Sequence, residues 1–210
     1  MSPFVILLGG DMTATARFAA QAAGARVIAA DSGIRHAVPL GLVPELWVGD
    51  FDSAAEDDHR RHADVPRRTF PAAKDKTDGE LAVDIALDEG ADTLVLAGAF
   101  GGDRADHAFL HLALATRMAE RGVPTVLTSG IQEGRLVPHG WSDWDHPPGT
   151  LFSVLGLSDL TGLSIEGADW PLDRVDMRFG SSLTVSNRVS GPLRIGLESG
   201  RAMLVAQVRE

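Results

Sequence analysis

The stretch Phe4-Val5-Ile6-Leu7-Leu8-Gly9-Gly10-Asp11 is an unbroken apolar run that ends in glycine and aspartate. A run of this kind predicts a strand that is buried on both faces, as in a parallel sheet. Residues 13–23 are rich in alanine, as expected of a helix, and the apolar residues 26–30 then lead into Asp31-Ser32-Gly33. The order strand, helix, strand predicts a right-handed crossover between parallel strands.

The same alternation continues to about residue 127. Further strands are expected at residues 46–48, 93–97 and 125–127, and helices at residues 77–88 and 105–121. Such a series predicts a mostly parallel sheet, and the ligands of these sheets bind beyond the carboxyl ends of the strands. The clusters rich in glycine and aspartate fall at those ends.

The pattern changes after about residue 130, where short alternating runs and turn signals replace helical stretches. The runs are residues 151–155, 163–165, 182–185, 193–197 and 203–208, and the turn signals are residues 147–149, 190–192 and 199–200. This pattern is typical of a small antiparallel sandwich or barrel. We therefore predict an α/β N-terminal domain with a mostly parallel sheet, residues 1–135, and a C-terminal all-β sandwich domain, residues 136–210.

Composition narrows the class of protein. The 210 residues carry a formal net charge of −10, which makes a nucleic-acid or anionic-membrane partner a poor expectation. There are no cysteines, so the chain has neither disulfides nor thiolate metal ligands. The first apolar run is too short for a membrane span and lacks the charged start of a signal peptide. We therefore expect a cytoplasmic protein.

The segment Gly49-Asp50-Phe51-Asp52-Ser53 directly follows an expected strand. Alternate residues of an extended backbone point the same way, so Asp50 and Asp52 could face one ligand. Two like charges this close need a cation between them, and Mg²⁺ binds one or two carboxylates together with substrate phosphates. The alternative interpretation is a polar turn in which Ser53 is the N-cap of the next helix.

The segment Lys74-Asp75-Lys76-Thr77-Asp78-Gly79-Glu80 carries a capping-box pattern in Thr77 and Glu80. The pattern puts Asp78 in the first helical turn and the two lysines just before a helix N-terminus, where phosphates are commonly held. An ordinary well-capped helix explains the same residues.

The segment Gly98-Ala99-Phe100-Gly101-Gly102-Asp103-Arg104-Ala105-Asp106-His107 joins an expected strand to a helix. Glycines allow the backbone to approach a phosphate closely, and Arg104, oriented by Asp106, could bind one bidentately. His107 and His111 share a helix face with apolar residues, which favours packed, hydrogen-bonded histidines over metal ligands. The three segments together have the cation-binding and phosphate-binding groups that metal-assisted phosphoryl transfer requires.

These segments, in this order, resemble the motifs of the thiamine pyrophosphokinase family. The resemblance extends into the C-terminal half and so covers nearly the whole chain. The matching segments are Asp31-Ser32-Gly33, Gly49–Ser53, Lys74–Asp78, Gly101–His107, Gly167-Ala168-Asp169-Trp170-Pro171-Leu172 and Ser186-Asn187.

The resemblance implies transfer of a diphosphoryl group from ATP to thiamine, with Mg²⁺ as cofactor. It also implies a homodimer that binds thiamine where the subunits meet. The residues it assigns are Asp50, Asp52 and Asp78 for catalysis and metal binding, Asp31, Lys74, Thr77, Arg104 and Asp106 for ATP, and Trp170, Ser186 and Asn187 for thiamine. Trp170 could stack on the flat cationic ring of thiamine, or it could be a core aromatic of the sandwich.

Three positions depart from the family pattern. Ser32 replaces a glycine, the arginine loop holds one extra residue, and Trp170 stands where the family often has tyrosine. Two other functions stay open at this point: diphosphoryl transfer to a pterin alcohol, and a non-catalytic module that senses nucleotide or thiamine.

Overall fold

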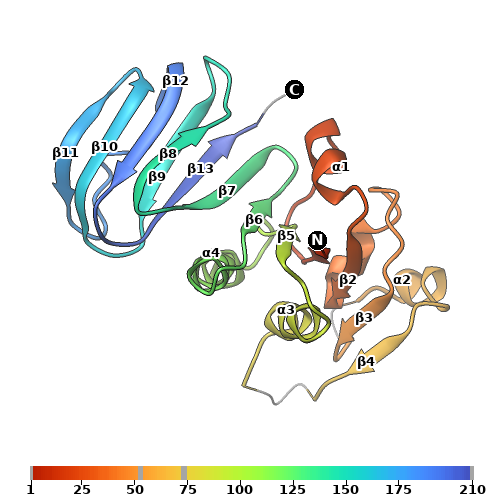
Figure 1. The fold of residues 1–210 in the computed structure, drawn as a ribbon. Coiled ribbons are helices and arrows are strands. Elements are labelled where there is room, and N and C mark those ends of the chain that lie inside the picture. Colours follow the sequence, from red (N-terminus) through yellow and green to blue (C-terminus); the bar gives the residue numbers. More distant parts are fainter. Residues whose placement is uncertain (1, 52–53, 72–74, 209–210) are drawn as a thin grey trace. The chain divides into compact units, whose positions relative to one another are not determined.

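The computed structural model describes residues 2–51, 54–71 and 75–208, which form two compact units (Figure 1). The units are Met1–Gly130 and Ile131–Glu210, and each has its own hydrophobic core. Asp52, Ser53 and Lys74 lie outside the described residues.

The N-terminal unit contains a parallel sheet with the strand order β6-β5-β1-β2-β3-β4. The strands are β1 (Pro3–Leu7), β2 (Arg26–Ala30), β3 (Leu46–Gly49), β4 (Arg67–Thr69), β5 (Thr93–Ala97) and β6 (Thr125–Thr128). In the register of β1 with its neighbours, Leu7 lies opposite Ala29 and Ala97. This register brings the carboxyl ends of the central strands to one edge of the sheet, and the predicted parallel sheet is confirmed.

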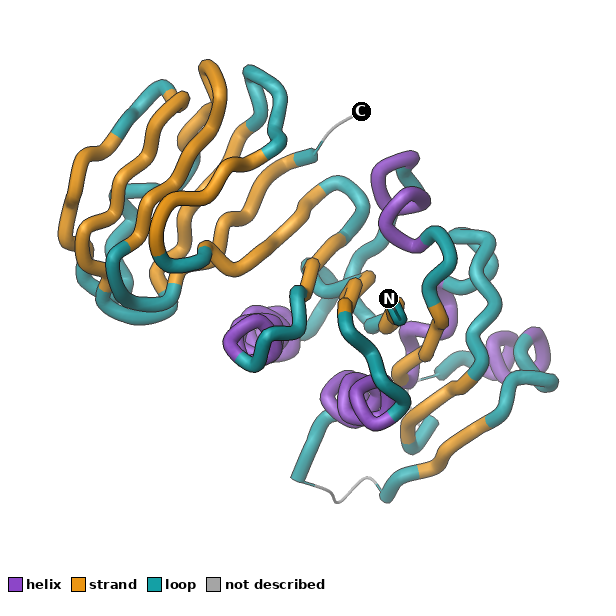
Figure 2. The backbone as a smooth tube through the Cα atoms, in the orientation of Figure 1, coloured by secondary structure: helices purple, strands orange, loops and turns teal. Residues whose placement is uncertain are grey.

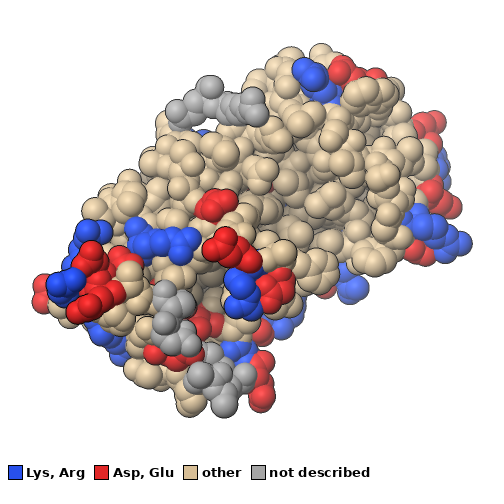
Figure 3. Space-filling model, turned by 180° about the vertical axis from the view of Figure 1, so that it is seen from behind, with Lys and Arg blue, Asp and Glu red and all other residues tan. Residues whose placement is uncertain are grey.

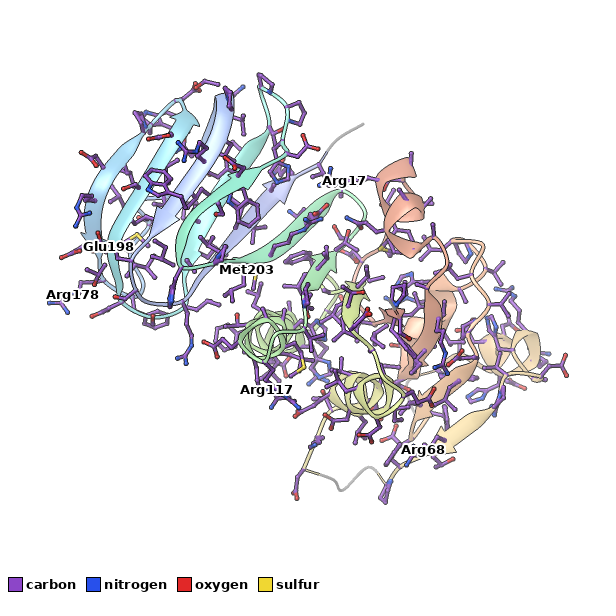
Figure 4. The ribbon with its side chains drawn as sticks, in the orientation of Figure 1. Arg17, Arg68, Arg117, Arg178, Glu198 and Met203 are labelled. Atoms are coloured by element: carbon purple, nitrogen blue, oxygen red, sulfur yellow. The ribbon has the colours of Figure 1, made fainter. Side chains whose placement is uncertain are left out.

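Helices connect these strands, as the alternating pattern predicts. They are α1 (Ala16–Ala22), the 3-10 helix η1 (Asp31–His36), α2 (Glu56–Arg61), α3 (Asp78–Asp88) and α4 (Ala105–Glu120). Helix α3 packs on β1, β2 and β3, and α4 packs on β6. Arg117 of α4, labelled in Figure 4, donates a hydrogen bond of 2.7 Å to Glu80 of α3, which ties these two helices together.

Trp47 of β3 is fully buried in the core of the N-terminal unit. A buried indole needs an acceptor for its N–H, and Trp47 Nε1 donates to the Asp31 carbonyl at 2.9 Å. Strand β3 is thereby fixed to the first residue of η1, close to the strand ends where ligands of such sheets bind.

The C-terminal unit is antiparallel, and its described residues contain strands and loops but no helix (Figure 2). The strands are β7 (Gln132–Val137), β8 (Gly140–Trp144), β9 (Leu151–Gly156), β10 (Leu160–Ala168), β11 (Leu172–Met177), β12 (Asn187–Leu197) and β13 (Ala202–Gln207). Two ladders, β7-β13-β9-β12 and β8-β12-β10-β11, share β12. The start of β12 pairs with β9 and the rest pairs with β8 and β10, so this one strand joins the two ladders.

Two expectations for this unit are wrong. Residues 182–185 form a turn rather than a strand, with a bond of 3.1 Å from the Val185 N–H to the Ser182 carbonyl. The turn signal at residues 190–192 lies inside β12. Pro192 has no N–H to donate, and the pairing with β10 is irregular between Glu166 and Ala168, which accommodates the proline in the strand.

The described residues include no helix that is both long enough and apolar enough to cross a membrane.

Candidate active site

A cleft of about 810 Å³ lies in the N-terminal unit at the carboxyl ends of the central strands. Its walls come from the segments after β1, β2, β3 and β5 and from the first turn of α3. Five of the residues predicted for the site line it: Asp31, Asp50, Thr77, Asp78 and Arg104. Segments that are far apart in the sequence are thus brought together as the parallel topology predicts.

Asp50 reaches the cleft because the backbone on either side of it is unusual. Gly49 and Phe51 have φ angles of 157° and 65°, and the Phe51 ring packs edge-on against Trp47 at 4.9 Å between ring centroids. The aromatic side chain therefore anchors the segment in the core while Asp50 lines the cleft. The capping interpretation is wrong, because α2 begins at Glu56 and its N-cap is Ala55.

Asp31 has a left-handed φ of 45° at the start of η1. Gly33 is required for close packing, because a Cβ there would lie 2.2 Å from the Leu7 carbonyl oxygen. Ser32 is not among the residues with positive φ. The serine at this position therefore brings no backbone strain, and the requirement for glycine falls on the next residue.

Thr77 is the N-cap of α3, as the capping-box pattern predicts, and its hydroxyl accepts a bond of 3.2 Å from the Glu80 N–H. The cap fixes the first turn of the helix, so Asp78 faces the cleft at a helix N-terminus. Lys76 also lines the cleft, but its Nζ donates to Asp84 at 2.6 Å. The charge of Lys76 is thus paired with the Asp84 carboxylate of α3.

Arg104 forms a two-pronged bond with Asp106, through Nε at 3.0 Å and Nη2 at 2.7 Å. This bond holds the pKa of the Asp106 carboxyl far below its usual range. Asp106 was expected to line the nucleotide side, but it is not among the residues that line the cleft, and its observed contact is the bond that orients Arg104. The guanidinium has five N–H donors, and those not used by Asp106 are available to a ligand.

The loop before α4, which holds the extra residue, turns at two glycines. Gly101 and Gly102 have φ angles of 68° and 74°, and Asp103 lines the cleft after them. His111 on α4 is partly buried, and its Nδ1 lies 3.0 Å from the Ala99 carbonyl oxygen. The prediction of a packed, hydrogen-bonded histidine is confirmed for His111, and both His111 and His107 line the cleft.

The turn after β1 is joined to this loop. The Gly10 N–H donates to the Gly98 carbonyl at 2.9 Å, and the Asp11 N–H donates to the Phe100 carbonyl at 2.7 Å. Asp11 and Arg35 line the cleft, although neither was predicted as a site residue. The glycine-aspartate end of the first strand pointed to Asp11, whereas Arg35 is brought to the site only by the tertiary structure.

The comparisons with known proteins agree along the chain. A family model described as the thiamin pyrophosphokinase catalytic domain matches residues 20–127. A second model, of the thiamin pyrophosphokinase vitamin B1 binding domain, matches residues 144–201. The thiamine pyrophosphokinase of Bacillus subtilis (strain 168) is 30% identical over 166 residues, which cover 77% of each chain. This chain belongs to the thiamine pyrophosphokinase family.

Solved thiamine pyrophosphokinase structures have the same fold. The crystal structure from Bacillus subtilis superposes with a TM-score of 0.84 at 23% identity and covers 100% of both chains. The structure from Candida albicans superposes with a TM-score of 0.82 at 14% identity, covering 99% of this chain and 89% of the other.

In this member of the thiamine pyrophosphokinase family, the predicted thiamine residues lie in the C-terminal unit. Trp170 is 62% exposed, so the core-aromatic interpretation is wrong. Asn187 is buried, and its side chain bonds the Trp170 backbone: Nδ2 donates to the Trp170 carbonyl at 2.8 Å, and Oδ1 accepts from the Trp170 N–H at 3.2 Å. Ser186 has a left-handed φ of 64° and donates its N–H to Ser153 Oγ at 3.0 Å. Asn187 therefore holds the segment that presents the Trp170 ring to solvent.

His36 is expected to make the stability of this family member depend on pH. The buried ring places Nε2 at 2.9 Å from the Gly10 carbonyl, and since a carbonyl only accepts, Nε2 carries the proton. Burial lowers the pKa of His36, and nearby Arg35 lowers it further, against the opposing effects of the Gly10 carbonyl and Asp11. Below about pH 6.5 histidine takes up a proton in the unfolded chain, whereas folded His36 stays neutral to lower pH. The free energy of unfolding is therefore expected to decrease as the pH is lowered below about 6.5.

The variant His36→Gln tests this expectation, because glutamine can donate to Gly10 but does not titrate. Urea unfolding at pH 5, 6 and 7 should show a smaller loss of stability for the variant than for the unmodified protein. Equal losses in both proteins would mean that His36 is not a source of the pH dependence.

Proposed function

We propose that this chain is a thiamine pyrophosphokinase that transfers the diphosphoryl group of ATP to the hydroxyl of thiamine, giving thiamine diphosphate and AMP. The observation that carries the proposal is the position of Asp50, Asp78 and Arg104 in one cleft of a chain that matches both domains of the family. We place ATP in this cleft, with Asp31, Thr77 and Lys74 as further contacts.

The chemistry of the cleft residues fits Mg²⁺. Carboxylate oxygens are its preferred ligands, and it usually takes one or two of them together with substrate phosphates. Among residues 2–51, 54–71 and 75–208, no group of three acidic or histidine side chains could hold a metal ion alone. We propose Asp50, Asp52 and Asp78 as the ligands, completed by the phosphates of ATP. The bound ion would neutralise charge on the phosphate oxygens during transfer.

The residues of the cleft have separable tasks in this reaction. Arg104, held by Asp106, would bind phosphate oxygens with its remaining N–H groups. The hydroxyl of thiamine attacks the β-phosphorus, AMP leaves, and Asp78 is our choice to accept the hydroxyl proton. On the face that Figure 3 shows, acidic and basic side chains lie next to one another at the lower left, while much of the rest of the face is uncharged. Positioning and charge stabilisation supply most of the catalysis.

We further propose that the two C-terminal ladders form a β-sandwich, that the chain is a cytoplasmic homodimer, and that thiamine stacks on Trp170. An exposed indole attracts a flat cation through its ring face. Asn187 would then act by holding the Trp170 backbone, and the neighbouring Ser186 would contact thiamine.

Trp170→Ala is expected to raise the KM for thiamine about two- to fivefold, which corresponds to the loss of one exposed cation–aromatic contact, and to leave the KM for ATP unchanged. Trp170→Phe should keep most of the affinity. The matched control is Trp141→Ala, which removes another exposed tryptophan of the same unit. Equal effects of the two alanine variants on the KM for thiamine would remove Trp170 from the substrate site.

The decisive test is AMP release from ATP with thiamine present and absent, in Mg²⁺. Thiamine-dependent AMP formation supports the proposal. AMP formation that depends on a pterin alcohol instead would identify a different acceptor. Binding of both ligands in calorimetry without turnover would identify a sensing module.

A further inference from the structure

The positive charges that line the cleft are not equivalent. They are Arg35, Lys76 and Arg104 among the described residues. Lys76 is bonded to Asp84 and Arg104 to Asp106, so each of these two cations already has a carboxylate partner. Arg35 bonds instead to two backbone carbonyls, of Gly9 and Gly10. Its partners carry no net charge, so the full positive charge of its guanidinium remains for a ligand.

The position of Arg35 is fixed from several directions. Its Nη2 donates to both carbonyls, with 3.0 Å to Gly10, and the same Gly10 oxygen accepts from His36 at 2.9 Å. A Cβ at Gly10 would lie 2.5 Å from the Gly98 carbonyl oxygen, so the turn packs closely against the segment after β5. A guanidinium held in this way loses little conformational entropy when a ligand arrives.

The chemistry of the free donors identifies the ligand. The guanidinium has five N–H groups, and only Nη2 is used by the two carbonyls. The remaining edge matches two oxygens of a phosphate, the geometry in which arginine binds anions most strongly. The lining also contains several carboxylates, such as Asp11 and Asp103, which would repel a polyphosphate unless cations compensate them.

We propose that Arg35 is a further nucleotide-binding residue of the cleft, which pairs with the polyphosphate of ATP and at the same time holds the turn after β1. The proposal rests on the proposed function, since it names a residue for the nucleotide of that reaction. The loss of Arg35 should weaken the binding of ATP more than that of AMP, because AMP lacks the diphosphoryl group that is transferred.

The test measures nucleotide binding by calorimetry in Mg²⁺ without thiamine, so that no turnover occurs. Arg35→Gln keeps a donor for the glycine carbonyls and removes the charge. Its Kd for ATP is expected to rise by at least about tenfold, while its Kd for AMP changes less than about threefold. Arg35→Lys, which keeps the charge, should bind ATP more tightly than Arg35→Gln. The control Arg60→Gln removes an exposed arginine of α2 and should bind ATP as the unmodified protein does.

A wrong assignment of Arg35 and a wrong proposed function would give different results in these measurements. Unchanged ATP binding by Arg35→Gln overturns the inference, and so does equal weakening of ATP and AMP, which would mean that Arg35 only holds the turn. If Arg35→Gln has a lowered unfolding temperature, Arg35→Lys decides: ATP binding as weak as in the glutamine variant overturns the inference. Absence of ATP binding and of AMP release in the unmodified protein would instead contradict the proposed function.

Discussion

Asp50→Asn is expected to reduce thiamine-dependent AMP release by at least about 10²-fold, the usual effect of losing one group that stabilises charge in a transition state. Asparagine has nearly the same shape, so the Phe51 anchor on Trp47 stays in place and the fold is retained. What changes is the charge: a neutral amide is a poor ligand for Mg²⁺. The concentration of Mg²⁺ needed for half-maximal rate should therefore rise. Steady-state AMP release over a Mg²⁺ titration measures both effects.

The matched control is Asp57→Asn, which removes an exposed acid from α2 outside the cleft. It should leave the rate and the Mg²⁺ requirement unchanged. Unfolding midpoints within about 2 °C of the unmodified protein would show that both variants are folded. If Asp50→Asn kept near-normal turnover, the metal-ligand assignment of Asp50 would be wrong.

Gly98→Ala is expected to lower the free energy of unfolding by about 2–5 kcal/mol, the sum of a left-handed backbone and overpacking. Gly98 has a φ of 78°, and a Cβ there would lie 2.3 Å from the Leu8 carbonyl oxygen. The Gly98 carbonyl also accepts the bond of 2.9 Å from the Gly10 N–H, so displacing it separates two walls of the cleft. ATP binding should weaken together with stability.

Gly90→Ala separates the two causes. Gly90 follows α3 with a φ of 86°, but a Cβ there would meet nothing within 4 Å. The control should therefore lose only about 1–2 kcal/mol from the backbone term and keep its ATP affinity. Urea unfolding of both variants measures the difference. Equal losses of stability would show that the contact with Leu8 is not the source of the effect.

The central strands of the N-terminal sheet could be predicted because they are buried on both faces. Strands β1, β2 and β5 are apolar runs followed by glycine or aspartate, and each begins and ends within one residue of the apolar runs at residues 4–8, 26–30 and 93–97. Strand β4 could not be predicted in this way. It is the edge strand Arg67–Thr69, all three residues are exposed, and its sequence has no apolar pattern.

The family motifs could be recognised in the sequence because the contacts within each motif join residues that are close together in the chain. The Thr77 cap and the Arg104–Asp106 pair join residues two or three positions apart, so their spacing alone predicted them. Asn187 was predicted to face thiamine, but its side chain bonds the backbone of Trp170, 17 positions earlier. Which way a polar side chain turns depends on neighbours that come from distant strands.

The sequence by itself determined the class of chain, the parallel sheet of its first half and the chemical types gathered at the strand ends. Apolar residues recur with different spacings in helices and strands, and glycine occurs where the backbone approaches closely. These features can therefore be recognised from short stretches of sequence. Only the tertiary structure decided that Phe51 anchors the Asp50 segment on Trp47 and that Arg35 keeps its charge for a ligand. Both depend on which segments the parallel register places side by side, and no local pattern contains that pairing.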